Sequence, residues 1–238
     1  MGGFFLLISP KFTLILHMLY IVATPIGNLK DITLRAIETL REVDFVLCED
    51  TRMTKRLLNH LEIEKTTISF HEYSDEKKFE EIFNMLRDGK KLALVTDAGT
   101  PGISDPGSFL VKRVREELPE IKIVPIPGVS AVTALLSVSG IRADEFTFVG
   151  FPPHKKGRKT FFERIASATA PVIFYESTHR LIKALESLNE ICPTKNLVIG
   201  KELTKMFEEI ITGTPVAVLA YLAENPDKTR GEFVIIAE

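Results

Sequence analysis

The alternation of short apolar segments with amphipathic segments is the feature that most constrains the fold of this chain. Buried strands are predicted from five short apolar runs, at residues 19–24, 45–47, 67–70, 91–96 and 121–125. Between them lie stretches whose apolar residues recur at helical spacing, as Phe79, Ile82 and Phe83 do, and Asp31 is the predicted N-cap of the first such helix. Strands that alternate with helices predict an α/β fold with a mostly parallel sheet covered on both faces.

The second half of the chain predicts a smaller, mixed sheet. Its candidate strands are residues 146–149, 172–175, 197–199, 208–212 and 232–237. The last two are expected to pair as antiparallel edge strands. We therefore predict two α/β domains, residues 18–142 and residues 143–238.

The first seventeen residues lie outside this pattern. They are apolar but interrupted by Pro10 and Lys11, so they do not provide the roughly 20 apolar residues of a membrane span. They also lack the basic start of a signal peptide. We interpret residues 1–17 as an extension upstream of a natural start at Met18, outside the fold, and expect no membrane association.

Cysteine usage and charge limit the classes of function. Cys48 and Cys192 show no metal-ligand spacing, so we predict no metal site, no disulfide and a reducing, cytoplasmic location. The formal net charge of −2 carries no global signature of a nucleic-acid binder. Any contact with RNA must therefore come from a local basic patch.

The longest loop rich in glycine and proline has the sequence Asp97-Ala-Gly-Thr-Pro-Gly-Ile-Ser-Asp-Pro-Gly107. It follows a predicted buried strand and leads into a helix, for which Asp105 is the predicted N-cap and Pro106 the first residue. Ligands bind outside the carboxyl ends of strands in open parallel sheets. The loop is longer than the usual connection of about 4–6 residues, which favours a binding loop over a plain turn.

Two further strand-end loops have the same character. They are residues 23–28 and 125–131, and three such loops after parallel strands are expected to converge on one small molecule. Each alone is compatible with ordinary turn chemistry. The chain contains no dinucleotide fingerprint, phosphate-binding P-loop, GxSxG elbow or HExxH zinc motif.

Six segments carry a resemblance to a known family. They are Tyr20-Ile-Val-Ala-Thr-Pro-Ile-Gly-Asn-Leu29, Glu49-Asp-Thr-Arg52, the loop from Asp97 to Gly107, Pro127-Gly-Val-Ser-Ala131, Glu176-Ser-Thr-His-Arg180 and Lys201-Glu-Leu-Thr-Lys205. Together they resemble the 16S ribosomal RNA cytidine 2′-O-methyltransferases, a branch of the tetrapyrrole-methylase superfamily. The resemblance covers Leu19 to Glu238, and residues 1–17 depart from the family pattern.

The resemblance implies S-adenosyl-L-methionine bound in a cleft between two α/β domains. It also implies a homodimer, a cytidine of the decoding centre as target, and 16S rRNA in the assembled small ribosomal subunit as partner. The cofactor contacts that it implies are Pro25, Asp97, Gly99, Thr100, Gly102, Ile103, Ser130, Ala131, Tyr175 and Glu202.

Candidate catalytic residues are less well defined. A ribose hydroxyl needs a base or an orienting hydrogen bond, and the candidates are Asp50, Arg52 and Lys201. Asp50 is equally compatible with a helix N-cap, and Lys201 is a base only if burial lowers its pKa. Glu176 and Arg180 are spaced as a surface ion pair at a helix start.

A basic loop is the candidate RNA contact. His154-Lys-Lys-Gly-Arg-Lys159 places four cations in six residues, and Lys155, Lys156, Arg158 and Lys159 are the predicted phosphate contacts. A solvated face is the simpler explanation for a charge run.

Two other functions stay open, a tetrapyrrole C-methyltransferase and a non-catalytic RNA-binding assembly factor with the same fold.

Overall fold

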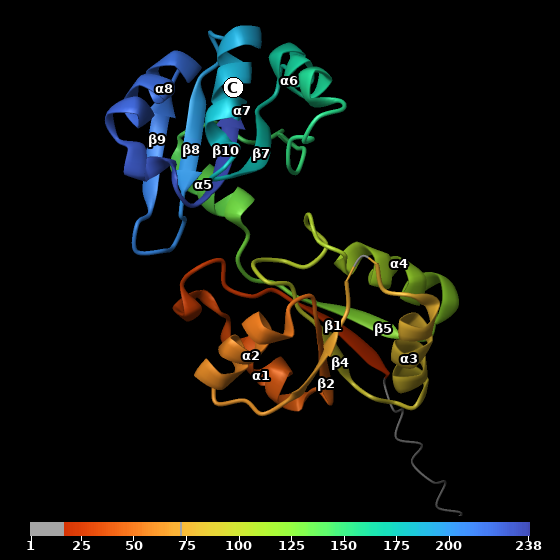
Figure 1. The fold of residues 1–238 in the computed structure, drawn as a ribbon. Coiled ribbons are helices and arrows are strands. Elements are labelled where there is room, and N and C mark those ends of the chain that lie inside the picture. Colours follow the sequence, from red (N-terminus) through yellow and green to blue (C-terminus); the bar gives the residue numbers. More distant parts are fainter. Residues whose placement is uncertain (1–16, 72) are drawn as a thin grey trace, which may run out of the picture.

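The computed structural model describes residues 17–71 and 73–238, which form two α/β lobes (Figure 1). Apart from His17, the predicted N-terminal extension lies outside the described residues. His17 belongs to the edge of the first lobe, because its carbonyl accepts a hydrogen bond from the Lys122 N–H at 3.0 Å and its Nδ1 lies 2.6 Å from the Leu86 oxygen. Within the described residues, no helix combines the length and the apolar character needed to cross a membrane.

The first lobe contains a parallel sheet with the strand order β3-β2-β4-β1-β5. Its strands are β1 (Met18–Val22), β2 (Phe45–Cys48), β3 (Thr66–Ser69), β4 (Leu92–Leu94) and β5 (Lys122–Ile126). Its helices are η1 (Leu29–Asp31), α1 (Leu34–Glu42), α2 (Thr51–His60), α3 (Glu76–Arg87) and α4 (Gly107–Glu117). One face of the sheet packs against α3 and α4, and the other packs against α1 and α2. The predicted parallel sheet with two covered faces is confirmed.

Two predicted helix starts in this lobe are wrong by a few residues. Asp31 ends the short helix η1, and the N-cap of α1 is Thr33, whose side chain accepts a hydrogen bond from the Ala36 N–H at 3.1 Å. Helix α4 begins at Gly107, with Pro106 at the cap position. The Asp105 carboxylate links the loop to the helix, because it accepts hydrogen bonds from the N–H groups of Gly102 in the loop and of Gly107, the first residue of α4.

The second lobe contains a mixed sheet with the strand order β6-β7-β10-β8-β9. Its strands are β6 (Thr147–Phe148), β7 (Val172–Ser177), β8 (Leu197–Lys201), β9 (Glu209–Gly213) and β10 (Glu232–Ala237). Only the β6–β7 pair among these neighbours is parallel. The helices are α5 (Ala131–Ser139), α6 (Arg158–Ser167), α7 (Leu181–Ile191), α8 (Pro215–Glu224) and η2 (Pro226–Thr229).

Strand β10 corrects the predicted pairing of the last two strands. It lies between β7 and β8, while β9 pairs with β8 at the edge. The physical reason is burial: every residue from Phe233 to Ala237 is buried, and such a strand must be covered on both faces. The carboxyl-terminal strand is therefore central to the second lobe.

Helix α5 connects the lobes. Figure 1 shows that the chain leaves β5 of the first lobe and enters α5 beside the second sheet. Val132 and Leu135 of α5 share a core cluster with Ile173 and Val198 of that sheet. The domain boundary near residue 143 stays a prediction, although α5, which it assigns to the first domain, packs against the second sheet.

Candidate functional site

The three loops rich in glycine and proline meet at the carboxyl edge of the first sheet. Thr24 and Gly99 exchange backbone hydrogen bonds of 2.9 and 3.1 Å, and the Thr24 hydroxyl donates to the Thr96 carbonyl at 3.0 Å. The Thr100 hydroxyl donates to the Val129 carbonyl at 3.0 Å. The loops after β1, β4 and β5 are thus tied together, as their positions after parallel strands predicted.

The central loop depends on glycine. Gly99 and Gly102 have φ values of +83° and +90°, a region that side chains with a Cβ rarely adopt. The Asp105 carboxylate holds the turn, since its Oδ1 accepts hydrogen bonds of 2.8 Å from the N–H groups of Gly102 and Gly107. The loop therefore presents a fixed backbone surface toward the second lobe.

A first cavity of about 320 Å³ lies between these loops, α5 and the second sheet. Six of the predicted cofactor contacts line it: Gly99, Thr100, Ile103, Ser130, Ala131 and Tyr175. Its aromatic wall is formed by Phe151 and Tyr175, whose ring centroids are 5.3 Å apart. Burial raises the pKa of Tyr175, so its hydroxyl remains a neutral hydrogen-bonding group.

A second cavity of about 400 Å³ adjoins the first on the side of α2. Two further predicted cofactor contacts, Pro25 and Asp97, line this cavity rather than the first. Five residues line both cavities and form their shared wall: Ile26, Thr96, Ala98, Lys205 and Glu232. The predicted cofactor residues are thus divided between two neighbouring spaces.

The remaining predicted site residues line neither cavity. The Gly102 N–H donates to the Asp105 carboxylate in the central loop, and the Glu202 carboxylate accepts a hydrogen bond from Lys205 of the shared wall. Lys201 on β8 is only 6% exposed, and its Nζ donates to the Phe207 carbonyl at 3.3 Å. The role of Lys201 as a base stays a prediction, and its Nζ is engaged by a backbone carbonyl away from both cavities.

Asp50 and Arg52 form a local structure at the start of α2. The Asp50 carboxylate accepts hydrogen bonds from the Arg52 N–H at 2.8 Å and from the Arg52 guanidinium at 2.7 and 3.1 Å. The Arg52 side chain thereby lowers the pKa of Asp50 to about 2. Such a weak base is poorly matched to proton abstraction near neutral pH. Asp50 is the N-cap that the sequence allowed, and its N–H donates to Asp97 Oδ1 at 3.2 Å.

Glu176 and Arg180 are not the surface ion pair that their spacing predicts. Glu176 lies in β7, its side chain is fully buried, and its Oε1 is 2.9 Å from Arg180 Nε. Arg180 also donates to the Pro152 carbonyl at 3.1 Å, so it anchors the start of the basic loop. The spacing suggested a surface pair because it cannot distinguish a strand end from the first turn of a helix.

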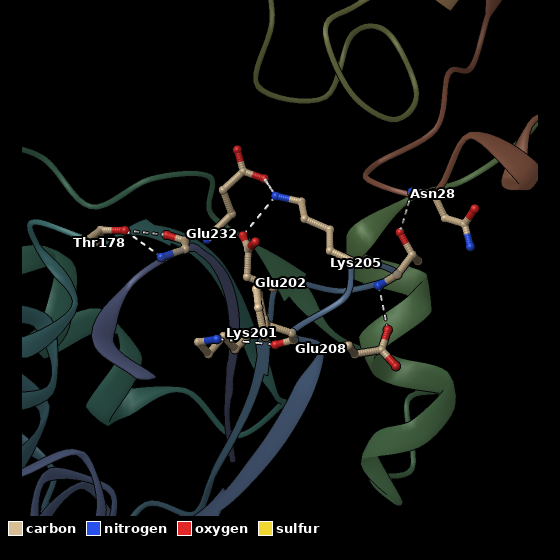
Figure 2. A network of polar contacts seen from close by, with 10 residues as sticks. Asn28, Thr178, Lys201, Glu202, Lys205, Glu208 and Glu232 are labelled. Carbon is tan, nitrogen blue, oxygen red and sulfur yellow. Dashed lines mark hydrogen bonds and ion pairs between the residues drawn. The ribbon is translucent and has the colours of Figure 1, made fainter. Parts of the chain in front are cut away.

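An ionic network at the shared wall was missed at the level of sequence. Figure 2 shows Lys205 between Glu202 and Glu232, with Nζ–carboxylate distances of 2.9 and 2.7 Å. Burial opposes the charge on Lys205, but its bonds to the two carboxylates outweigh burial and raise its pKa. Lys205 therefore stays protonated. Lys205 stands in one of the segments that carried the resemblance, but nothing local to it indicated Glu232 as its partner.

The same turn contacts the first lobe. The Asn28 N–H donates to Thr204 Oγ1 at 3.1 Å (Figure 2), and a Cβ on Gly27 would clash with Lys205 Cγ. Gly27 thus allows the close approach of the lobes at the wall that both cavities share.

The predicted basic loop is only partly free to bind a ligand. Lys155 and Lys156 are exposed, whereas Lys159 lies 3.7 Å from the Glu163 carboxylate. The Arg158 guanidinium stacks on Phe162 at 5.1 Å and donates to the Pro153 carbonyl.

Across residues 17–71 and 73–238, no group of three or more His, Cys, Asp or Glu side chains is placed to hold a metal ion.

Comparisons with known proteins place this architecture in a family. The family model for Tetrapyrrole (Corrin/Porphyrin) Methylases matches residues 18–217. Among solved structures, a cobalt precorrin-4 methyltransferase superposes with a TM-score of 0.68 at 17% identity, covering 93% of this chain and 94% of the other. The uroporphyrin-III C-methyltransferase of Thermus thermophilus gives 0.63 at 17% identity, covering 92% and 94%. At these identities the superpositions show the fold alone.

Sequence relatives are much more similar. Ribosomal RNA small subunit methyltransferase I of Leptospira biflexa is 46% identical over 92% of this chain and 90% of its own length. The protein of that name from Haemophilus influenzae is 44% identical over 93% and 78%. This chain therefore belongs to the tetrapyrrole methylase family and, within it, to the ribosomal RNA small subunit methyltransferase I group.

Proposed function

We propose that this protein transfers the methyl group of S-adenosyl-L-methionine to the ribose 2′-hydroxyl of a decoding-centre cytidine in 16S rRNA. The observation that carries this proposal is the 41–46% identity, over at least 92% of the chain, to proteins named ribosomal RNA small subunit methyltransferase I. The two adjoining cavities support it, because group transfer needs two ligands side by side.

The first cavity fits the proposed cofactor. Its volume of about 320 Å³ lies within the range of small-molecule sites, roughly 300–1,000 Å³. Phe151, Tyr175 and Leu203 offer an apolar wall to a purine nucleoside. Ser130 and Ala131 present the first turn of α5, whose N–H groups suit a carboxylate. The cofactor would supply an electrophilic methyl group on a sulfonium.

The residues of the shared wall would orient the acceptor hydroxyl. A correctly placed acceptor can account for up to about 7–11 kcal/mol of a barrier. Lys205 is a hydrogen-bond donor rather than a base, because its pKa is raised. Asp97 and Glu232 are the carboxylates in the wall of the second cavity that can accept a hydrogen bond from the hydroxyl.

Three expectations accompany this proposal. The exposed ammonium groups of Lys155 and Lys156 would contact RNA phosphates, which makes binding salt-dependent. The protein would work as a homodimer, which light scattering would reveal as twice the chain mass. Its substrate, the small ribosomal subunit, would place it in the cytoplasm.

The experiment combines the protein, radiolabelled S-adenosylmethionine and unmodified small ribosomal subunits. We expect label in 2′-O-methylcytidine after digestion to nucleosides, at a decoding-centre position on mapping. Cofactor binding without label in RNA would contradict the RNA assignment and favour a tetrapyrrole acceptor, to be tested with a precorrin. Absence of cofactor binding would favour a non-catalytic assembly factor.

A further inference from the structure

The shared wall between the two cavities constrains where an acceptor can bind. Transfer of a methyl group requires the attacking atom roughly 3–3.5 Å from the group that it attacks. The two ligand sites must therefore open onto each other. The first and second cavities meet this condition, since Ile26 after β1, Thr96 after β4 and Lys205 after β8 line both.

The second cavity has the chemistry of a nucleotide site. Its apolar lining comes from Ile26, Leu29, Met53 and Leu57 and suits the faces of a base. Its volume of about 400 Å³ is within the range of small-molecule sites, roughly 300–1,000 Å³. At its rim stands Arg56, which is exposed and forms no ion pair with any carboxylate in the described part of the chain.

We propose that the second cavity receives the acceptor nucleoside, unstacked from a single-stranded stretch of RNA, with Arg56 on a flanking phosphate. RNA-binding proteins recognise sequence mostly in such splayed-out nucleotides. The inference rests on the proposed function, because it assigns the acceptor site of that reaction. The first cavity then holds the cofactor alone.

The arrangement of α2 supports this assignment. Arg52 uses its Nε and one terminal nitrogen on the Asp50 carboxylate and does not line the cavity. Arg56 follows one turn later and lines the cavity, whereas its exposed neighbour Lys55 does not. Lys55 and Arg56 carry the same charge, but only Arg56 lines the second cavity.

A matched pair of truncations tests whether the first cavity binds the cofactor and the second binds the acceptor. Met53 lines only the second cavity and Ile103 lines only the first, and both residues are 45% exposed. We expect Met53→Ala to raise the KM for small subunits by about tenfold, with unchanged affinity for S-adenosylhomocysteine in calorimetry. Ile103→Ala should weaken S-adenosylhomocysteine binding and leave the KM for subunits close to that of the wild type.

A second pair tests the phosphate contact. Arg56→Gln should lower kcat/KM for small subunits by about tenfold and reduce the slope of log KM against log salt by about one. Lys55→Gln, the matched control on the same helix, should have a clearly smaller effect. Equal effects would indicate a diffuse basic surface and overturn the role of Arg56.

The outcomes separate this inference from the function on which it rests. A wild-type protein that methylates no RNA overturns both. An active wild type whose Met53→Ala and Arg56→Gln variants match it in KM overturns the acceptor site alone. Weaker S-adenosylhomocysteine binding by Met53→Ala would assign the second cavity to the cofactor and also overturn it.

Discussion

The two lobes contribute to the site in different ways. In the first lobe all strands are parallel, so the loops after β1, β4 and β5 leave the sheet at one edge and bind each other through backbone hydrogen bonds. In the second lobe the turn after β8 brings in Glu202 and Lys205, and β10 brings in Glu232. At the shared wall the first lobe thus contributes uncharged residues, and the second contributes charged side chains.

The turn after β8 also differs in backbone conformation. Glu202 and Thr204 have φ values of +48° and +66°, which non-glycine residues seldom adopt. Such conformations persist where surrounding contacts fix them. Here the fixing contacts are the ion pairs of Lys205 and the hydrogen bond from Asn28 to Thr204. The difference between the lobes teaches that the shared wall depends on a few side chains in one strained turn.

The largest expected effect concerns the cores of the lobes. Phe83 and Phe174 are fully buried, one in each lobe. Replacing either by Ala should lower the free energy of unfolding by about 3–5 kcal/mol, through lost burial and a cavity. Urea unfolding followed by circular dichroism measures both. Equal shifts of a single transition would show that the lobes unfold together, and a shift of one of two transitions would show that they are independent.

The next effect tests the network at the shared wall. Lys205→Met should reduce methyl transfer by about ten- to a hundredfold, because two charge-assisted hydrogen bonds are lost beside both cavities. Lys228→Met is the matched control, since Lys228 pairs with Glu209 at 2.6 Å in the same lobe but lines neither cavity. Equal losses of activity in the two variants would contradict a specific role for Lys205.

The pH dependence of that network is the third test. Burial tends to raise the pKa of Glu202, but the hydrogen bonds from Lys205 and the Glu232 N–H, together with the nearby lysine charges, outweigh burial and lower the pKa. The stabilisation from Glu202 is therefore present above the ordinary glutamate pKa of about 4.3 and is lost as pH falls through the lowered value. The pKa of Lys205 is raised, so its contribution is present below the ordinary lysine value of about 10.4 and is lost at higher pH.

The wild type should therefore exceed the Lys205→Met variant in thermal stability by the largest margin between about pH 5 and pH 10. Calorimetry across this range measures it. A difference that is the same at pH 3 and at pH 7 would show that these ion pairs do not stabilise the contact between the lobes.

The smallest effect compares helix starts in the two lobes. Thr33 caps α1 with a hydrogen bond from the Ala36 N–H, whereas the Thr214 side chain makes no capping bond to α8 in the described structure. Thr33→Ala should cost about 1 kcal/mol of unfolding free energy, and Thr214→Ala should cost much less. Asp31→Ala should likewise cost less than Thr33→Ala, because Asp31 does not cap α1. Equal costs in urea unfolding would contradict these cap assignments.

Much of the fold was predictable because its signals are local. The apolar runs that became β1 to β5 and the stripe of α3 follow from the periods of strands and helices. The convergence of the loops at residues 23–28, 97–107 and 125–131 followed from one topological rule for parallel sheets. The sequence alone therefore determined the class of fold, the edge where the site lies and the loops that build it.

Only the tertiary structure decided which charged side chains reach that edge. Glu232 meets Glu202 and Lys205 because β10 inserts between β7 and β8, a pairing between distant segments that no local pattern encodes. The burial of Glu176 at the end of β7 and the placement of Lys201 away from both cavities have the same origin. Periodicity fixes the face that a side chain takes within its own element, but the neighbours of that face depend on long-range strand order.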